Sequence, residues 1–375
     1  MLLTPDQEMI RDAVRDFARE QLWPHAPRWD RERTFPREVH RGLAALGAYG
    51  ICVPEEFGGA DLGYLSLALV LEEIAAGDGG TSTAISVTNC PVNAILMRYG
   101  KAAQKQRWLT KLAAGDMLGV FCLTEPHVGS DAAALRTTAT KDSDGYLING
   151  VKQFITSGRN GQLAVVIAVT DKGAGKKGMS AFLVPTDTSG YVVARLEEKL
   201  GQRSSDTAQI NFDNCRIPVE NLIGEEGEGY RIALSSLEGG RIGIAAQSIG
   251  MARSALEVAI DYAKERESFG TAIINHQAVG FRLADCATKL EAARQLVWHA
   301  ASLRDAGRPC LKEAAMAKLF ASEAAEQVCS AAIQTLGGYG YVNDFPVERI
   351  YRDVRVCQIY EGTSDVQKII IQRAL

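Results

Sequence analysis

The chain has 375 residues, which at about 150 residues per domain corresponds to one large body or to two or three packed domains. With 46% hydrophobic and 23% charged residues, and no apolar run near the roughly 18 residues of a membrane span, the composition excludes disordered, collagen-like and transmembrane proteins. The 41 basic and 45 acidic residues give a net charge of −4, so no basic excess is available to neutralise nucleic-acid phosphates, and a small-molecule partner is favoured.

The cysteines and the first residues of the chain indicate a reducing compartment. The eight cysteines form no CxxC pair, and none has a histidine at the spacing of a metal site, so we expect reduced core residues and no metal. The segment Thr4-Pro5-Asp6-Gln7 combines an N-cap, a proline at the first helical position and a capping-box glutamine, which predicts a helix start. Neither a secretory signal nor a transit peptide is recognisable, so a cytoplasmic location is expected.

Helical periodicity dominates the first third of the chain. From residue 5 to about 118, apolar residues such as Ile10, Val14 and Phe17 recur at helical spacing, and glycines end the segments. After Gly119 the pattern changes to short β-rich runs that are separated by turn residues. Strands are expected at 120–124, 146–149, 164–170, 180–184 and 208–212.

Long helical segments return from about residue 227 to the end of the chain. They are expected at 229–266, 276–306, 310–336 and 363–373, and long antiparallel helices that are joined by short turns form a bundle. The predicted fold class is therefore α+β, and its three parts are an N-terminal all-α domain (1–118), a middle β-barrel-like domain (119–225) and a C-terminal four-helix bundle (226–375). Binding sites often lie where such layers meet.

The most informative segment is 359–367, which reads Ile-Tyr-Glu-Gly-Thr-Ser-Asp-Val-Gln. Ser364 and Gln367 fit a capping box, so a helix is predicted to start there, with Glu361 just outside it and Gly362 as a flexible neighbour. The carboxylate has two interpretations. It could be an acidic residue stabilised by the helix N-terminus, which the local pattern favours. It could also be a general base among apolar side chains, where desolvation would raise its pKa against the pull of the helix dipole.

Other segments are weaker candidates for ligand contacts. Residues 121–131 form a strand end that opens into a loop rich in hydroxyl and backbone N–H groups, and 154–158 is a strand end with a hydroxyl pair before a turn. Both patterns also fit plain turns, and His127 is expected to be a surface loop residue. Near two helix ends, Arg266 could hold a pyrophosphate, and the pair Gly337–Gly338 would let backbone approach a ligand closely, although each is also an ordinary feature of a helix end.

In this order and at these separations, the segments closely resemble the acyl-CoA dehydrogenase family, in particular its short-chain, butyryl-CoA dehydrogenase-like branch. Several motifs in register are more specific than any one of them, and together they reverse the preference at Glu361, which becomes the expected catalytic base. The family fold encloses a β-domain and FAD between two helical domains, in agreement with the predicted order. One branch carries its base at the position that matches Gly240, where glycine cannot serve. Glu238 is a spare candidate, but it is expected to face another side of its helix.

The resemblance implies an FAD site that is assembled from three parts of the chain. The strand ends would lie along the flavin, through Phe121, Leu123, Thr124, Gly129, Ser130, Phe154, Ile155 and Thr156. A neighbouring subunit would hold the adenine and pyrophosphate through Arg266, Phe269, Gln277, Gln334, Gly337 and Gly338. The last helix would complete the site through Thr363, Ser364 and Asp365. Because the cofactor would be shared between chains, a homotetramer built from dimers is implied.

The resemblance also implies the reaction. The acyl-CoA would contact Ser130, Arg241, Tyr360, Glu361 and Gly362. Glu361 would remove the α-proton of a short straight or methyl-branched thioester, while the β-hydrogen leaves as hydride to the flavin. The product would be a trans-2-enoyl-CoA, and electron-transferring flavoprotein would receive the electrons, as in fatty acid β-oxidation or branched-chain amino acid catabolism.

Two alternatives and two departures from the family pattern remain open. An acyl-CoA oxidase on the same scaffold would pass electrons to oxygen, and a helical binding protein would have lost catalysis. Phe154 stands where many relatives have tryptophan beside the flavin, which affects the expected contact with the electron acceptor. His127 replaces a common glycine near the mouth of the expected acyl channel.

Overall fold

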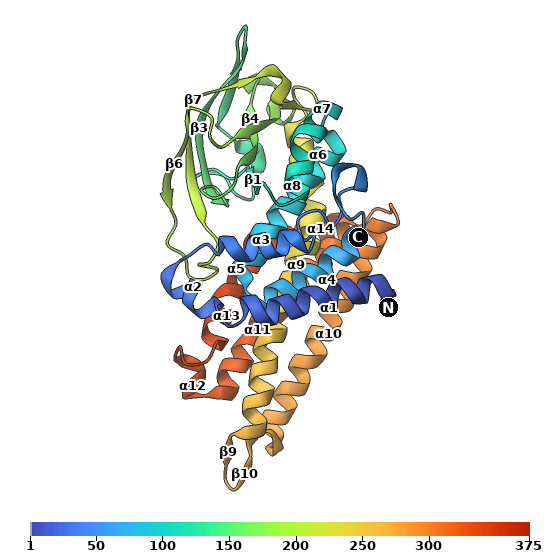
Figure 1. Cartoon of the computed structure of the whole chain (residues 1–375), viewed down its shortest axis with the longest axis vertical. Coiled ribbons are helices and arrows are strands. Elements are labelled where there is room, and N and C mark those ends of the chain that lie inside the picture. Colours follow the sequence, from blue (N-terminus) through green and yellow to red (C-terminus); the bar gives the residue numbers. More distant parts are fainter. Residues whose placement is uncertain (1) are drawn as a thin grey trace.

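Helical and β-structured parts alternate along the chain, as Figure 1 shows for the computed structural model, which describes residues 2–375. The first part is helical and begins at the predicted capping box, where Thr4 Oγ1 accepts from the N–H of Gln7, and Gln7 Oε1 accepts from the N–H of Thr4. Its α-helices are α1 (Pro5–Phe17), α2 (Ala26–Glu32), α3 (Arg37–Ala45), α4 (Gly63–Gly77), α5 (Gly79–Val87), α6 (Ala94–Tyr99), α7 (Ala102–Gln104) and α8 (Thr110–Ala113).

A sheet occupies the middle of the chain, with the strand order β6-β7-β3-β2-β4-β5-β8 and with β1 parallel to β4. The five predicted strands are present, but two of them run much further than expected. The predicted run ended at residue 149, but β3 continues past Gly150. A shift in the pairing register with β7, between Ile148 and Gly150, accommodates the glycine within the strand. The strands are β1 (Gly119–Cys122), β2 (Thr138–Lys141), β3 (Gly145–Thr156), β4 (Leu163–Val169), β5 (Met179–Pro185), β6 (Tyr191–Leu196), β7 (Thr207–Pro218) and β8 (Leu222–Ile223).

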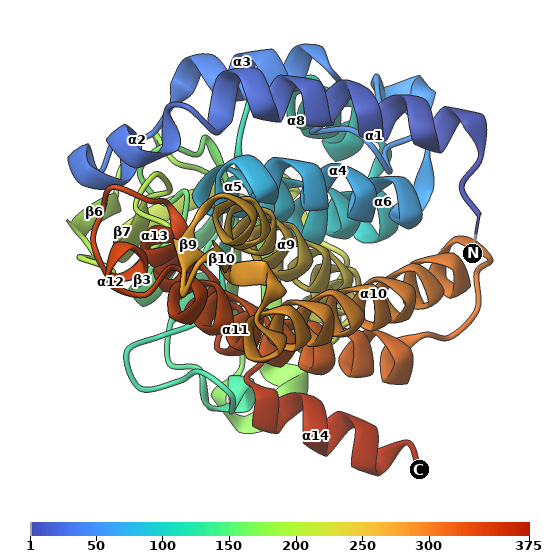
Figure 2. The ribbon, with the colours of Figure 1, turned by 90° about the horizontal axis from the view of Figure 1, so that it is seen from below.

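Long helices form the last part and agree with the predicted segments to within a residue or two. Helix α9 lies between α4 and α11, so one hydrophobic core joins the N-terminal helices to the bundle (Figure 2). Residues in the middle of α9 are therefore buried between two helical layers. This agrees with the predicted α+β fold class. The elements are α9 (Gly229–Glu265), β9 (Glu267–Ser268), β10 (Thr271–Ala272), α10 (Gln277–Asp305), α11 (Leu311–Leu336), α12 (Gly338–Tyr341), α13 (Val347–Val354) and α14 (Ser364–Arg373).

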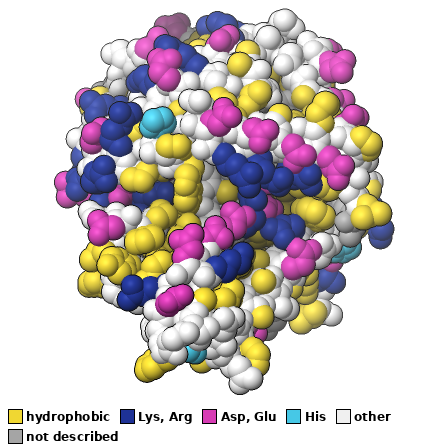
Figure 3. Space-filling model, turned by 60° about the horizontal axis from the view of Figure 1, so that its bottom comes forward, with side chains coloured by type: hydrophobic (Ala, Val, Ile, Leu, Met, Phe, Trp, Pro, Cys, Tyr) yellow, Lys and Arg dark blue, Asp and Glu magenta, His cyan; other side chains and the backbone are white. Residues whose placement is uncertain are grey.

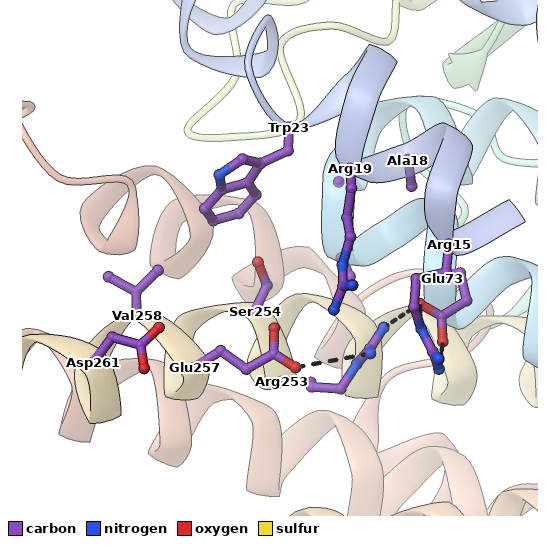
Figure 4. A pocket seen from close by; sticks show the side chains of 12 residues that line it. Arg15, Ala18, Arg19, Trp23, Glu73, Arg253, Ser254, Glu257, Val258 and Asp261 are labelled. Atoms are coloured by element: carbon purple, nitrogen blue, oxygen red, sulfur yellow. Dashed lines mark hydrogen bonds and ion pairs between the residues drawn. The ribbon is translucent and has the colours of Figure 1, made fainter. Parts of the chain in front are cut away.

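Ion pairs connect α1, α4 and α9 along a pocket of about 210 Å³ (Figure 4). The buried carboxylate of Glu73 accepts from Arg15 Nη2 at 2.8 Å and from Arg253 Nη2 at 2.6 Å. Glu257 lies at the rim, 3.8 Å from Arg253. Because Glu73 pairs with both Arg15 and Arg253, we interpret this pocket as a structural junction between the helical layers.

Replacing Glu73 with glutamine is expected to lower the free energy of unfolding by about 2–3 kcal/mol, because two guanidinium groups lose their shared anion. The loss stays below that of a fully buried pair, since water reaches both Arg15 and Arg253. Urea unfolding measures it, with Glu257→Gln as the control from the exposed rim, where a charge contributes little. Equal losses in the two variants would contradict the prediction.

Candidate active site

Glu361 lies on a short turn between α13 and α14 and faces helix α9. Both Glu361 and Gly362 have positive φ, 54° and 88°. A Cβ added at Gly240 would lie 2.8 Å from Oε2 of Glu361, so any larger residue there would force the carboxylate out of this position. Glycine at residue 240 therefore cannot supply a base, but it makes space for one.

The surroundings of Glu361 change its acidity. Burial raises the pKa of the carboxyl to about 7, although the cations Arg241 and Lys318 act in the opposite direction. Oε2 is buried and has no hydrogen-bond partner among residues 2–375. Arg241 is also buried, and its Nε and Nη1 have no hydrogen-bond partner in the same part of the chain. A carboxyl that ionises near neutral pH, in a site with unpartnered polar groups, is suited to act as a general base.

The predicted capping box at the start of α14 is wrong by one residue. Thr363 is the N-cap, and its Oγ1 accepts from the N–H of Val366 at 3.3 Å, because Ser364 is already the first helical residue. Gln367 is one position too far along for a capping box. Its Nε2 donates instead to the carbonyl oxygens of Glu361, at 3.1 Å, and of Gly362, at 2.8 Å. Gln367 therefore holds the turn that carries Glu361.

Tyr360, a predicted substrate contact, has its hydroxyl engaged inside the protein. The hydroxyl donates to Gln247 Oε1 at 2.7 Å and accepts from Gln202 Nε2 at 3.3 Å. The backbone N–H of Gln202 in turn donates to Asp353, and burial raises the pKa of the Asp353 carboxyl to about 6. This network supports the turn that carries Glu361. The sequence did not indicate it, because the hydrogen-bonded partners of Tyr360 lie 113 and 158 residues away along the chain.

The predicted flavin residues at the strand ends lie close together. The N–H of Gln153 donates to the carbonyl of Thr124 at 2.8 Å, so the loop after β1 runs beside the end of β3. Phe154 is 62% exposed and has a φ of 58°. The half-buried members are Phe121, Leu123, Thr124 and Thr156; Ile155 is buried, whereas Gly129 and Ser130 are exposed. His127 is exposed on the same loop, as expected.

The residues predicted for the adenine and pyrophosphate gather at the free end of the bundle. They are all exposed, and they come from the end of α9, the β9–β10 hairpin, the start of α10 and the end of α11: Arg266, Phe269, Gln277, Gln334, Gly337 and Gly338. Three of them line a cavity of about 520 Å³. Figure 1 places this end at the bottom, opposite the sheet, so one chain does not bring these residues to the strand ends.

The remaining candidates are placed as follows. Thr363 and Ser364 are half-buried, Ser364 Oγ has no hydrogen-bond partner among residues 2–375, and Asp365 is exposed. Glu238 pairs with Arg304 at 2.7 Å and accepts from the thiol of Cys310, so the spare candidate does face another side of α9.

Residues 2–375 contain neither a cluster of metal-ligating side chains nor a helix that could span a membrane. No group of three or more His, Cys, Asp or Glu side chains within 2–375 could hold a metal ion. No helix in that range is long and apolar enough to cross a membrane. All eight cysteines are free, and seven of them are buried, as the sequence predicts for core residues.

Sequence reasoning missed Lys318, which lies beside Glu361. Lys318 is fully buried on α11. The available signal was a lysine on an otherwise small, apolar helix face, formed by Ala314, Ala315, Ala317 and Ala321. A lysine in such a position must have a buried partner, but periodicity does not reveal which one.

Comparisons with known proteins agree with this arrangement along the whole chain. Models described as the N-terminal, middle and C-terminal domains of acyl-CoA dehydrogenase match residues 4–116, 120–215 and 227–375. The human short-chain specific acyl-CoA dehydrogenase, mitochondrial, is 46% identical over 98% of this chain and 90% of its own length.

Two solved structures have nearly the same fold. The butyryl-CoA dehydrogenase from Megasphaera elsdenii matches with a TM-score of 0.98 and 39% identity, covering 100% of this chain and 99% of that one. A chain from a structure described as the electron transferring flavoprotein of Acidaminococcus fermentans matches with a TM-score of 0.98 and 44% identity, covering 100% of this chain and 98% of its own. Since the three domain models follow the helix, sheet and helix order seen here, the resemblance drawn from the motifs is confirmed, and the chain belongs to the acyl-CoA dehydrogenase family of oxidoreductases.

Proposed function

We propose that this chain oxidises short acyl-CoA thioesters to trans-2-enoyl-CoA, with Glu361 as the base. The observation that carries the proposal is the placement of the Glu361 carboxyl: its buried Oε2 lies close to Gly240, and burial raises the pKa of the carboxyl to about 7. An ordinary glutamate, with a pKa near 4.3, is a weak base for a C–H proton. A carboxylate whose pKa matches the working pH removes such a proton more effectively.

The turn also supplies a donor for the thioester carbonyl. The backbone N–H of Glu361 donates no hydrogen bond within residues 2–375. In the proposed complex it binds the thioester oxygen, which stabilises the negative charge that develops when the α-proton leaves. Arg241 adds positive charge close to the same atoms, and the buried walls exclude water from them.

FAD is the cofactor of this family, and the residues present here fit it. The exposed aromatic ring of Phe154 offers a stacking group for a flavin. Hydrogen-bonding groups are offered by two adjacent strand ends and by the hydroxyl of Ser364, which has no partner among residues 2–375. Thr124 and Thr156 are proposed to hold its polar edge. When bound, FAD supplies the acceptor for the β-hydrogen, and the protein supplies the orientation of the substrate.

The same proposal requires a neighbouring subunit, because the predicted adenine-binding residues lie far from the strand ends of their own chain, and the homotetramer built from dimers that the resemblance implies would provide it. The free end of the bundle exposes large hydrophobic side chains, and exposed apolar groups also lie on the lower part of the molecule in Figure 3. The exposed hydrophobic side chains at the free end of the bundle are Phe269, Phe281, Tyr339, Tyr341 and Val342. Such groups fit an interface with another copy better than they fit water. A cytoplasmic location stays a prediction of the sequence.

Electron-transferring flavoprotein is the proposed electron acceptor, and the match to the Acidaminococcus fermentans structure supports this choice. The test is anaerobic reduction of the purified yellow protein by a panel of butyryl-, isobutyryl-, 2-methylbutyryl- and hexanoyl-CoA. We expect the flavin absorbance to bleach with at least one of them and to return when electron-transferring flavoprotein is added. Rapid return in air with peroxide formation would support the oxidase alternative, and a colourless protein would support the non-catalytic one.

A further inference from the structure

Lys318 is a charged side chain with no exposed surface and no role in the family motifs considered above. It lies on α11 with a relative exposure of 0%. Its Nζ donates to the carbonyl oxygen of Gly362 at 2.8 Å, and this is its one hydrogen bond within residues 2–375. Burying an ammonium group is costly unless it is paired, so the contact with Gly362 needs a functional or structural reason.

The carbonyl that Lys318 holds belongs to the turn of the catalytic base. Glu361 has a positive φ, a conformation that non-glycine residues adopt only when the surrounding structure holds them there. Two side chains hold this turn by its carbonyl oxygens. Gln367 donates to those of Glu361 and Gly362, and Lys318 donates to that of Gly362. Lys318 is the charged one of the two, and it comes from a different helix.

Lys318 also contributes to the charge around Glu361. The groups that act on the lysine are the thiol of Cys357, the carboxylates of Glu361 and Glu323 and the guanidinium of Arg241. Burial lowers the pKa of the Lys318 ammonium to about 8, while Cys357 and Glu361 raise it. The same lysine lowers the pKa of Glu361. One side chain therefore fixes the backbone of the base and favours its ionised form.

We propose that Lys318 is a positioning residue for Glu361, because its ammonium group fixes the carbonyl of Gly362. The fixed turn keeps the Glu361 carboxylate against α9 and leaves the backbone N–H of Glu361 accessible to substrate. The inference rests on the proposed function, since it assigns a role within that reaction. Lys318 contacts neither the substrate nor the Glu361 carboxylate that takes the proton. Its effect passes through the turn and through the local charge.

Two variants separate the hydrogen bond from the charge. Lys318→Met removes both, whereas Lys318→Gln keeps a donor and removes the charge. We expect Lys318→Met to lower kcat on the order of 10²-fold, because the base is misplaced, with a much smaller change in KM. Below the pKa of the base, kcat should fall as pH is lowered, and this part of the pH profile is the acid limb. In both variants the acid limb is expected to move to higher pH, since loss of a nearby cation raises the pKa of Glu361. Lys312→Met, at a partly exposed lysine on the same helix, is the control and should match the wild type.

The outcomes distinguish this inference from the proposed function. If none of the acyl-CoA substrates bleaches the flavin of the wild-type protein, the proposed function itself is wrong. If wild type turns over and both folded variants keep its kcat and its acid limb, the positioning role is overturned. If Lys318→Met does not fold, Lys318→Gln decides by the same acid limb. Failure of both variants to fold would overturn the proposal in favour of a purely structural lysine.

Discussion

Replacing Glu361 with glutamine is expected to lower kcat by about 10³–10⁴-fold while the protein stays folded and yellow. Glutamine has nearly the same shape, so it fits the space beside Gly240 and keeps the turn that Gln367 holds. Its amide cannot accept the α-proton. Stopped-flow bleaching with butyryl-CoA measures the loss, and the flavin content of the purified variant shows that the site is still formed.

The wild-type rate should carry the signature of the same carboxyl. Because burial raises the pKa of Glu361 to about 7, the active carboxylate is present above that pH and is protonated below it. We therefore expect kcat to fall tenfold for each pH unit below the pKa and to level off above it. This fall of kcat at low pH should be absent from the residual activity of Glu361→Gln, because the variant has no carboxyl at residue 361 to protonate.

Glu238→Gln is the matched control, because Glu238 lies on α9 itself, two residues from Gly240, but is paired with Arg304. It should keep the rate of the wild type within a few-fold, with the same acid limb. Turnover by Glu361→Gln at the wild-type rate, or loss of the acid limb in Glu238→Gln alone, would show that the base has been assigned to the wrong carboxylate.

Much of this site could be predicted because its parts are local in sequence. The helical period and its glycine stops predicted α9, α10 and α11 closely, since long helices repeat the signal many times. The glycine at residue 240 and the glutamate at residue 361 together indicated where a base could be. The physical link between them, a carboxylate oxygen seated where a side chain would otherwise be, depends on packing between distant segments.

The misses have equally specific causes. The edge strand β6 has largely exposed side chains, so it lacks the buried alternation that marks a strand. The cap of α14 was placed on Ser364 because serine and threonine are adjacent there, and both are good N-caps. Lys318 was missed, and Gln367 was assigned the wrong partner, because both donate to backbone carbonyls, which have no sequence signature.

The buried ion pair between Lys152 and Glu125 anchors the loop that begins after β1. Removing its cation should lower the free energy of unfolding substantially. Lys152 on β3 is fully buried, and its Nζ donates to Glu125 Oε1 at 2.9 Å and to the carbonyl of Leu123 at 3.0 Å. Glu125 also accepts from the N–H groups of Arg136, at 2.7 Å, and Thr137, at 3.0 Å. The pair therefore ties both ends of the loop to the sheet.

Lys152→Met is expected to lower the free energy of unfolding by about 3–5 kcal/mol at pH 7, because the Glu125 carboxylate stays buried without its cation. Burial raises the pKa of Glu125, but Lys152 and the hydrogen bonds outweigh this, and the pKa lies below its usual value. The stabilisation by the pair is thus present at neutral pH and is lost as pH falls. Since the unpaired carboxyl in the variant protonates at higher pH, the difference between the two proteins should narrow on acidification.

Urea unfolding at neutral and mildly acidic pH measures both effects, and Lys141→Met, which removes an exposed lysine from β2, is the control with little expected change. In the double variant Lys152→Met, Glu125→Gln the buried charge is gone, so most of the lost stability should return. The single variant should also lose flavin more readily, because Leu123 and Thr124 are released from the end of β3. The prediction is contradicted if adding Glu125→Gln to Lys152→Met lowers the free energy of unfolding by as much as Glu125→Gln does in the wild type. The two residues would then not be coupled, and the loop would be held by its backbone hydrogen bonds alone.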